Sequence, residues 1–312
     1  MNRNSPSAFV LVGPTASGKS AVAQLLAEKT GAAVISADSM NIYRGMDIGT
    51  AKPSLEERTR VKTFGVDLAD PTENFSVGGW LNAVRPAFQH RAQLQKNEVG
   101  GSASPIVVGG TGLYVKCLLQ GLDDIPTADE ALRDRAENMT LAELQSEARC
   151  IAPEAYAALA DKENPRRLIR LLEGRKFSDS WKTEMPVVIG LHVERDVLHR
   201  RIAERVEKMY AGGLLKEAQR LAGLELSSTA QHAIGYAEAF AVLRSECTEA
   251  EAKERTIIRT RQLSKRQMTW FRNQLNVEWV EASDHSNLGQ LADRVYAAFT
   301  ERGPVSLSGI CL

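Results

Sequence analysis

The sequence predicts an α/β fold in which helices flank a parallel sheet and a small all-helical domain is inserted into the chain. Four short runs rich in Val and Ile lack polar alternation, which is typical of strands buried on both faces of a parallel sheet. Helical stretches such as SAVAQLLAEKT separate the runs, as crossover connections between parallel strands require. The segment 123–185, by contrast, is charged and helical and contains no strand-like run, and it predicts the insertion.

The expected elements follow in chain order. The four runs begin at residues 7, 32, 105 and 186 and read SAFVLVG, AAVISA, PIVVGG and PVVIGLHV. After the fourth run the pattern predicts helix to about residue 275, a short strand at VEWV and a last helix near LGQLADRVYAAFT.

Start and stop signals mark the helices of the insertion. Thr140 and Glu143 have the spacing of a capping box, Pro165 suits the first turn of a helix, and Gly174 is a stop signal. We therefore expect two domains: a catalytic core of residues 1–122 plus 186–312, and a helical insertion of residues 123–185.

Composition limits the classes of protein that fit. The chain has 312 residues, 43% of them apolar, and a formal net charge of +0, which argues against a protein that coats nucleic acid over its whole surface. No window reaches the roughly 18 apolar residues of a membrane span, so we expect a soluble, cytoplasmic protein without a membrane partner. The four cysteines are far apart and predict neither a disulfide nor a zinc site.

Residues 13–20, GPTASGKS, match the phosphate-binding motif Gly-x-x-x-x-Gly-Lys-Ser between a strand and a helix, which predicts a sheet like that of P-loop NTPases. In such a loop the backbone N–H groups cradle phosphate, the lysine reaches the outer phosphate and the serine can ligate Mg²⁺. The expected diphosphate-binding residues are Gly13, Pro14, Thr15, Ala16, Ser17, Gly18, Lys19 and Ser20, with Ser20 as the metal ligand.

Asp38 is the first acidic residue expected to face this loop. It follows the second strand, and ligands of open α/β sheets bind at the carboxyl ends of the strands. The third run ends in VVGGTGLY without an acidic residue, and no Asn-Lys-x-Asp base reader of a GTPase is present. These residues alone leave open a small-molecule kinase, with ATP in the loop and Asp38 on Mg²⁺, and a non-catalytic nucleotide switch.

Longer blocks resemble the tRNA dimethylallyltransferases. In order, these blocks are GPTASGKS, SADSMNIYRGMDIGTAKP, VGGTGLY, NPRRLIRLLE, RIAERVEKMYAGGL, IGYAE and TRQLSKRQMTWFR, and they span residues 13–272. The chain departs from the family pattern in three places: Asn41 replaces a common Gln, TFGVDLADP lacks a His pair, and LLEG replaces ALEV.

The resemblance implies an enzyme that transfers a dimethylallyl group from dimethylallyl diphosphate to N6 of the adenosine 3′-adjacent to the anticodon, at position 37. Lys19, the loop N–H groups and a Mg²⁺ on Ser20 would stabilise the departing diphosphate. Asp38 would accept the proton of the amine. Thr111 matches a threonine at the reacting region, and Arg205 an arginine that reaches the diphosphate from the far side. A prenyltransferase for free adenine nucleotides is the alternative with the same chemistry.

The resemblance also implies contacts with the tRNA anticodon stem-loop, made by an enzyme expected to act as a monomer. Seven basic residues against one acid between Lys253 and Arg272 predict two basic rows on a helix that could follow phosphates. The insertion is expected to clamp the RNA. The expected tRNA-binding residues are Asp38, Ser39, Met40, Asn41, Thr111, Arg133, Arg166, Arg167, Leu168, Ile169, Arg170, His232, Ala233, Ile234, Gly235, Tyr236, Ala237, Arg255, Arg259 and Arg266. Trp80, Met268 and Trp270 are expected to be core residues.

Overall fold

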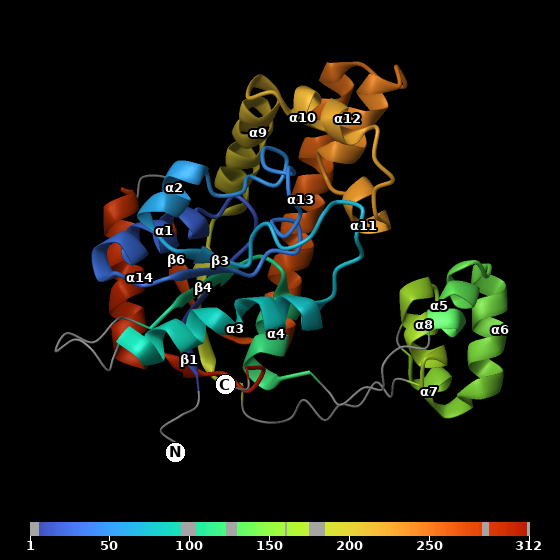
Figure 1. Ribbon diagram of the computed structural model, residues 1–312, viewed down its shortest axis with the longest axis horizontal. Helices are drawn as coiled ribbons and strands as arrows, with labels where there is room; N and C mark the ends of the chain where they lie inside the picture. Colours follow the sequence, from blue (N-terminus) through green and yellow to red (C-terminus); the bar gives the residue numbers. More distant parts are fainter. Residues whose placement is uncertain are drawn as a thin grey trace. The chain divides into compact units, whose positions relative to one another are not determined.

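The structure is a computed structural model of the 312-residue chain, and it describes residues 6–94, 104–122, 130–159, 161–174, 185–282 and 287–310. The chain divides into two compact units. The first unit comprises Met1–Gly121 and Met185–Leu312, and the second comprises Leu122–Glu184. The domain joins expected from the sequence lie one residue further along the chain at each place. Figure 1 shows the elements of both units.

A seven-stranded sheet forms the centre of the first unit. Six strands are parallel neighbours in the order β3-β2-β4-β1-β5-β6, and β7 pairs with β1 in antiparallel fashion. The predicted α/β fold is therefore confirmed. The strands are β1 (Ser7–Val12), β2 (Val34–Ser36), β3 (Thr63–Phe64), β4 (Ile106–Gly109), β5 (Val187–His192), β6 (Asn276–Glu281) and β7 (Val305–Ser306).

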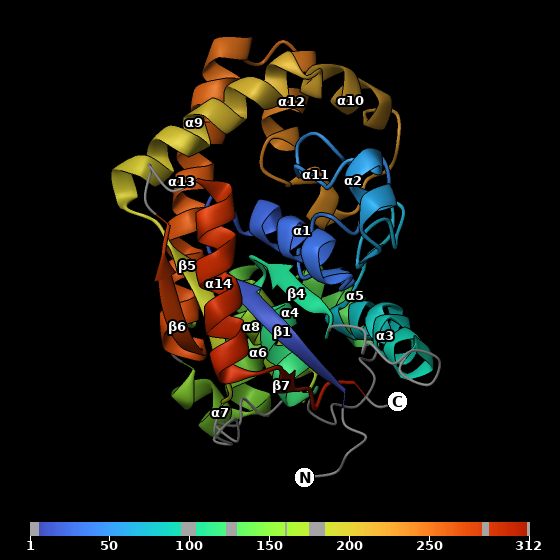
Figure 2. The ribbon, with the colours of Figure 1, turned by 90° about the vertical axis from the view of Figure 1, so that its left-hand side faces the viewer.

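Helices cover both faces of this sheet. One apolar cluster packs alternate strand residues such as Val10 and Val107 against α3, α4 and α13, and the other packs Leu11 and Val108 against α1 and α14. Figure 2 looks onto the face covered by α1 and α14. Burial on both faces explains the continuous apolar runs. The helices are α1 (Lys19–Thr30), α2 (Leu55–Arg60), α3 (Val77–Leu94), α4 (Gly112–Gln120), α9 (Arg195–Ala211), α10 (Leu214–Leu221), α11 (Ser228–Gln231), α12 (Tyr236–Leu243), α13 (Glu249–Gln274) and α14 (Leu288–Arg302).

The second unit is helical throughout its described residues. It contains α5 (Glu130–Glu137), α6 (Leu141–Ile151), α7 (Pro153–Ala158) and α8 (Pro165–Leu172). Thr140 and Glu143 make the expected capping box, Pro165 begins α8, and Gly174 adopts a positive φ of 74° shortly after the helix ends. These helices enclose an apolar core of their own, which includes Leu144, Tyr156 and Leu168.

The structure also bears on membrane-spanning helices and on the state of the cysteines. Within the described ranges, no helix has the length and apolar character needed to cross a membrane. Cys117, Cys150 and Cys247 carry free thiols, and Cys311 lies outside the described residues.

Candidate active site

The phosphate loop connects β1 to α1 and adopts an unusual backbone. Ala16 and Gly18 have positive φ angles of 64° and 89°, whereas Ser17 donates its N–H to the Pro14 carbonyl at 3.2 Å. Alternation of left- and right-handed residues turns successive N–H groups inward and makes an anion-binding nest. A non-glycine residue at positive φ costs roughly 1 kcal/mol, and such strain is found mostly at functional sites.

Lys19, the first residue of α1, lies at the floor of the loop. Its side chain is buried, and Nζ donates to the Pro14 carbonyl at 3.1 Å. Burial lowers the pKa of Lys19 to about 8; the nearby charge of Asp38 opposes this shift and that of Arg205 adds to it. The three charged groups expected at the site thus act on one another.

Arg205 reaches the loop from α9. Nη1 donates to Thr15 Oγ1 at 3.2 Å, and Nη2 donates to the Thr50 carbonyl at 3.3 Å. Burial lowers the pKa of Arg205, while Asp38 raises it. The guanidinium therefore contacts the phosphate loop directly.

A hollow of about 550 Å³ opens between the loop and α9. Lys19 and Arg205 supply positive charge to its wall, and Ser20 at the start of α1 is exposed. Its further lining residues are Ala16, Gly18, Ala21, Ile48, Ala51, Arg201, Glu204, Lys208 and Met209. The size and charge of this hollow suit a diphosphate group.

Asp38 and Thr111 meet at the carboxyl ends of β2 and β4. Thr111 Oγ1 accepts the Ser39 N–H at 3.0 Å, and Asp38 Oδ1 accepts the Met40 N–H at 2.9 Å. Gly109 allows this approach, because a Cβ there would stand 2.1 Å from the Ala37 carbonyl oxygen. Thr111 thus fixes the turn that holds the Asp38 carboxylate.

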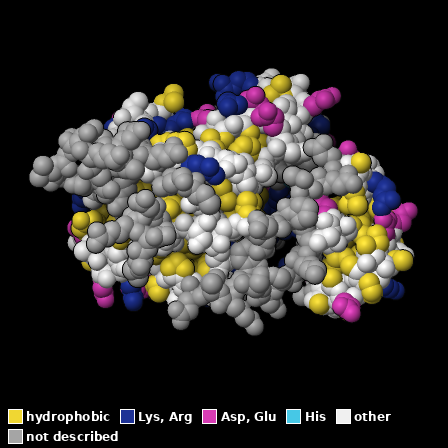
Figure 3. Space-filling view, turned by 60° about the horizontal axis from the view of Figure 1, so that its bottom comes forward, with side chains coloured by type: hydrophobic (Ala, Val, Ile, Leu, Met, Phe, Trp, Pro, Cys, Tyr) yellow, Lys and Arg dark blue, Asp and Glu magenta, His cyan; other side chains and the backbone are white. Residues whose placement is uncertain are grey.

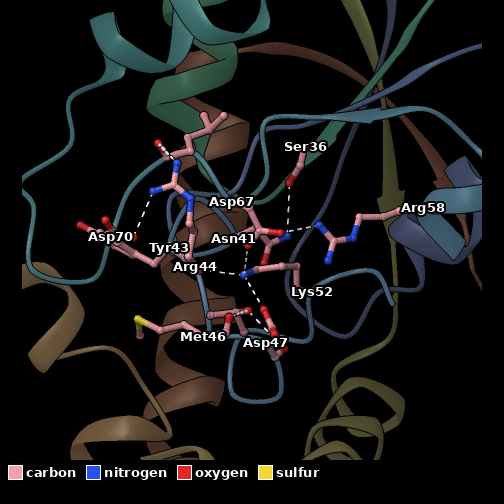
Figure 4. Close-up of polar contacts among 12 residues, drawn as sticks. Ser36, Asn41, Tyr43, Arg44, Met46, Asp47, Lys52, Arg58, Asp67 and Asp70 are labelled. Carbon is pink, nitrogen blue, oxygen red and sulfur yellow. Dashed lines mark hydrogen bonds and ion pairs between the residues drawn. The ribbon is translucent and has the colours of Figure 1, made fainter. Parts of the chain in front are cut away.

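Lys52 anchors the loop that follows Asp38. Its side chain is only 1% exposed, and Nζ donates to the Tyr43 carbonyl at 2.6 Å, to Asp47 at 2.6 Å and to Asp67 at 2.7 Å (Figure 4). Partial burial raises the pKa of Asp67, but hydrogen bonds from Lys52 and Arg58 outweigh it and hold that pKa below its usual value. No sequence motif indicates this network, whose members Lys52 and Asp67 are 15 residues apart.

Glu217 of α10 anchors the tip of the same loop. Its buried carboxylate accepts N–H groups from Ile48 at 2.9 Å and Asp47 at 3.2 Å, and the hydroxyl of Tyr236 donates to it. Gly49 N–H donates to the Tyr236 hydroxyl at 3.2 Å, and burial raises the pKa of Tyr236. Glu217 has the sequence setting of an ordinary helix residue, so no local signal could have identified it.

Several expected RNA-binding side chains are buried instead. Tyr236 and Ala233 belong to the core of the first unit, and Leu168 and Ile169 to the core of the second, so a contact of these residues with RNA would have to come from the backbone. The buried Asn41 donates to Ser36 Oγ at 3.2 Å. Outside α13, the expected residues that are exposed or partly so are Asp38, Ser39, Met40, Thr111, Arg166, Arg167, Arg170, His232, Ile234 and Ala237. Gly235 is buried, and the Arg133 side chain lies outside the described residues.

Helix α13 carries the predicted basic residues, but they differ in their surroundings. Arg255, Lys265, Arg266 and Arg272 are exposed. Arg259, by contrast, pairs with the buried Glu238 and donates to the His232 carbonyl at 3.0 Å. Its charge is therefore already compensated within the protein. On the face in Figure 3, the coloured Lys and Arg side chains are interspersed with Asp and Glu side chains.

The tryptophans divide between core and surface. Trp80 is wholly buried, as expected, and its Nε1 donates to the Ser36 carbonyl at 3.0 Å. Trp270 and Met268 are only partly buried. Trp270 lines a surface hollow of about 520 Å³ with Gln262, Lys265, Arg266, Thr269, Asn273 and Gln274.

Ser20 is the residue of the loop that could hold a metal ion. Across the described ranges, no three His, Cys, Asp or Glu side chains gather in a metal-binding group. Ser20 is exposed at the hollow, and Mg²⁺ commonly combines few protein ligands with water and substrate phosphates. The donor set therefore fits a Mg²⁺ that arrives with a diphosphate.

Comparison with known proteins gives consistent matches. The IPP transferase family model matches residues 41–274, and the isopentenyl transferase model matches residues 6–64. A tRNA dimethylallyltransferase of Streptomyces griseus is 38% identical over 310 residues, which cover 93% of this chain and 95% of that protein. One of Geobacter metallireducens is 40% identical over 290 residues, 87% of this chain and 91% of that protein.

Solved structures agree with these matches. The tRNA isopentenylpyrophosphate transferase of Bacillus halodurans superposes with a TM-score of 0.67 at 36% identity, covering 94% of this chain and 97% of that chain. A eukaryotic dimethylallyltransferase acting on tRNA has a TM-score of 0.78 at 23% identity, covering 95% and 79%. The second likeness shows a common fold.

Proposed function

The chain belongs to the IPP transferase family, and on this basis we propose that it transfers a dimethylallyl group from dimethylallyl diphosphate to N6 of the adenosine at position 37 of tRNA. One observation carries the proposal at the level of the site. A carboxylate, that of Asp38, acts on two partly or wholly buried cations, Lys19 and Arg205, beside a hollow of diphosphate size. The proposed proton acceptor therefore lies close enough to the proposed anion cradle for their charges to interact.

The residues around the phosphate loop would stabilise the diphosphate as it leaves the prenyl donor. As the bond between C1 of the dimethylallyl group and oxygen breaks, negative charge develops on the diphosphate. Lys19, the N–H groups of the loop and Arg205 are positioned to bind that charge, and preorganised groups of this kind dominate many active sites. Mg²⁺, held by Ser20, would neutralise part of the same charge.

Asp38 and the residues next to it would activate the amine of adenine, which is a weak nucleophile. The exocyclic amine of adenine attacks C1 as the diphosphate departs, and the new N–C bond leaves a surplus proton on nitrogen. Asp38 would accept that proton, and the hydrogen bonds of Ser39 to Thr111 and of Met40 to Asp38 would keep its carboxylate oriented.

Exposed cations supply the hold on tRNA. Arg255, Lys265, Arg266 and Arg272 of α13, together with Arg166 and Arg167 of α8, are free of the ion pairing that engages Arg259 in the described residues. Contacts of such side chains with phosphates bind RNA without reading sequence. A prenyltransferase for free nucleotides would have no use for them, and we propose a monomer acting on the anticodon stem-loop.

The test is a transfer assay with labelled dimethylallyl diphosphate. The purified protein is mixed with tRNA, with free adenine nucleotides, or with ATP and no prenyl donor. We expect label in tRNA at the adenosine 3′ to the anticodon, and no label when Lys19→Met replaces the wild type. Label in free nucleotide would favour the alternative prenyltransferase. Transfer of the terminal phosphate of ATP, with the prenyl donor untouched, would overturn the proposal in favour of a kinase.

A further inference from the structure

Gln267 of α13 bridges the two halves of the candidate site with one side-chain amide. Its Oε1 accepts the N–H of Thr15 in the phosphate loop at 2.8 Å, and its Nε2 donates to the carbonyl of Gly110 at 3.0 Å. Gly110 immediately precedes Thr111, which fixes the turn of Asp38. The amide therefore links the loop that binds the donor to the turn that holds the proton acceptor.

Glycines shape the seat of α13 on this turn. A Cβ on Gly110 would stand 2.4 Å from Gln267 Nε2, and one on Gly112 would stand 2.1 Å from Trp270 Cε3. An L side chain at either place would force Gln267 or Trp270 to shift from its position. The absence of a side chain at Gly110 and Gly112 thus lets the Gln267 and Trp270 side chains of α13 pack directly on the backbone at these two residues.

Side chains from two helices, α13 and α9, contact Thr15. Gln267 of α13 holds its backbone N–H, and Arg205 of α9 holds its hydroxyl at 3.2 Å. Thr15 in turn sits in the nest that would receive the diphosphate. A small movement of α13 therefore acts on the geometry of the loop through a directional hydrogen bond, and catalysis is sensitive to displacements of this size.

The two residues that precede Gln267 in the sequence are exposed cations. Lys265 and Arg266 are exposed, and they line the same surface hollow as Trp270. RNA phosphates that bind these cations would fix the helix whose buried side carries Gln267. Phe271, which is wholly buried, keeps α13 on the core while this happens.

We propose that Gln267 is a positioning residue that couples RNA binding on α13 to diphosphate binding in the phosphate loop. This inference rests on the proposed function. RNA bound to the exposed cations holds α13 against Gly110 and Gly112, and Gln267 then holds Thr15 in the arrangement that binds diphosphate. By linkage, diphosphate strengthens RNA binding by the same factor.

The experiment measures the affinity for inorganic pyrophosphate with and without an anticodon stem-loop RNA. For the wild type we expect RNA to tighten pyrophosphate binding by roughly five-fold or more. Gln267→Met keeps the length of the side chain but removes both hydrogen bonds, and it should reduce that factor to about one while changing the affinity for RNA alone by less than about two-fold.

Two further variants control for a structural effect. Gln24→Met removes a glutamine that also joins two elements, since Gln24 Nε2 donates to the Glu57 carbonyl at 3.1 Å, and it should retain full coupling. Gln267→Glu keeps the acceptor for Thr15 but loses the donor to Gly110, so an intermediate coupling factor is expected. It also serves as the test if Gln267→Met does not fold.

The outcomes separate the inference from the proposed function. Coupling that is absent in the wild type, or unchanged in both Gln267 variants, overturns the inference even when the wild type prenylates tRNA. A wild type that transfers no dimethylallyl group to tRNA overturns the proposed function instead, whatever the binding measurements show.

Discussion

Burial of Lys19 gives diphosphate binding a specific pH dependence. The protonated ammonium binds the anion, and its pKa in the free protein is lowered to about 8. A bound diphosphate raises that pKa, so the affinity should be constant well below pH 8 and should fall above it, approaching ten-fold per pH unit until the pKa of the complex is reached. The dissociation constant of dimethylallyl diphosphate measured from about pH 7 to pH 9.5 checks this. Lys19→Met should show weaker binding without this fall, and a flat wild-type profile would contradict the assignment.

Asp38 should matter for chemistry rather than for binding. Asp38→Asn keeps the shape of the side chain but removes its basicity, so the turnover number should fall by roughly 10² to 10⁴. Pyrophosphate should bind no more weakly, because the carboxylate that offsets Lys19 and Arg205 is gone. Single-turnover transfer and equilibrium binding separate these effects. If RNA affinity collapsed while the chemical step kept its rate, Asp38 would be a recognition residue.

Local pattern determined which site residues could be predicted. The eight residues of the phosphate loop share a motif, and Asp38 follows a recognisable strand, so both were identified from sequence. Gln267 and Glu217 were missed because their partners lie 252 and 169 residues away, and no periodicity carries such a contact. Leu168 and Tyr236 were assigned to RNA because they stand in blocks that resemble the family, but such a block also contains the buried residues that support it.

Strands and helices could likewise be predicted where a local sequence pattern marks them, but not where a contact with a distant element decides the structure. The four apolar runs are strands, because burial on both faces leaves a clear apolar pattern. VEWV is also a strand, although it lies at the edge of the sheet and its residues are only partly buried. β3 and β7 have two residues each, too few to have a period. The basic rows of α13 followed from helical geometry, but the pairing of Arg259 with Glu238 depends on α12 and could not be predicted from α13 alone.

Within α13, Arg266 and Arg259 form a matched pair for a test. Arg266→Gln removes an exposed cation and should weaken RNA binding about uniformly across sequences, reducing the slope of log affinity against log salt by about one. Arg259→Gln should instead lower the free energy of unfolding by roughly 1–3 kcal/mol, because it leaves the carboxylate of Glu238, 5% exposed, without its cation. Salt titrations and urea unfolding check the two. Equal salt slopes for both variants would contradict the distinction.

On the scale of the whole molecule, the two units have separate apolar cores. Replacing Leu122–Glu184 with a flexible Gly/Ser linker of roughly ten residues should therefore leave the first unit folded. We expect pyrophosphate affinity within about two-fold of the wild type, with weaker binding of the stem-loop because Arg166 and Arg167 are lost. Thermal unfolding and binding titrations check this. Unchanged RNA affinity would exclude the insertion from RNA binding.

The contact between Thr15 and Gln267 also bears on the order in which a ribosome makes this chain. The loop emerges early, but its partner follows 252 residues later, which at roughly 5–20 residues per second is a delay of tens of seconds. Until α13 has been synthesised, the phosphate loop of the nascent chain therefore lacks its hydrogen bond to Gln267. A prematurely terminated product that ends before α13 would leave the Thr15 N–H without its acceptor, so the loop would lack the hydrogen bond that joins it to α13.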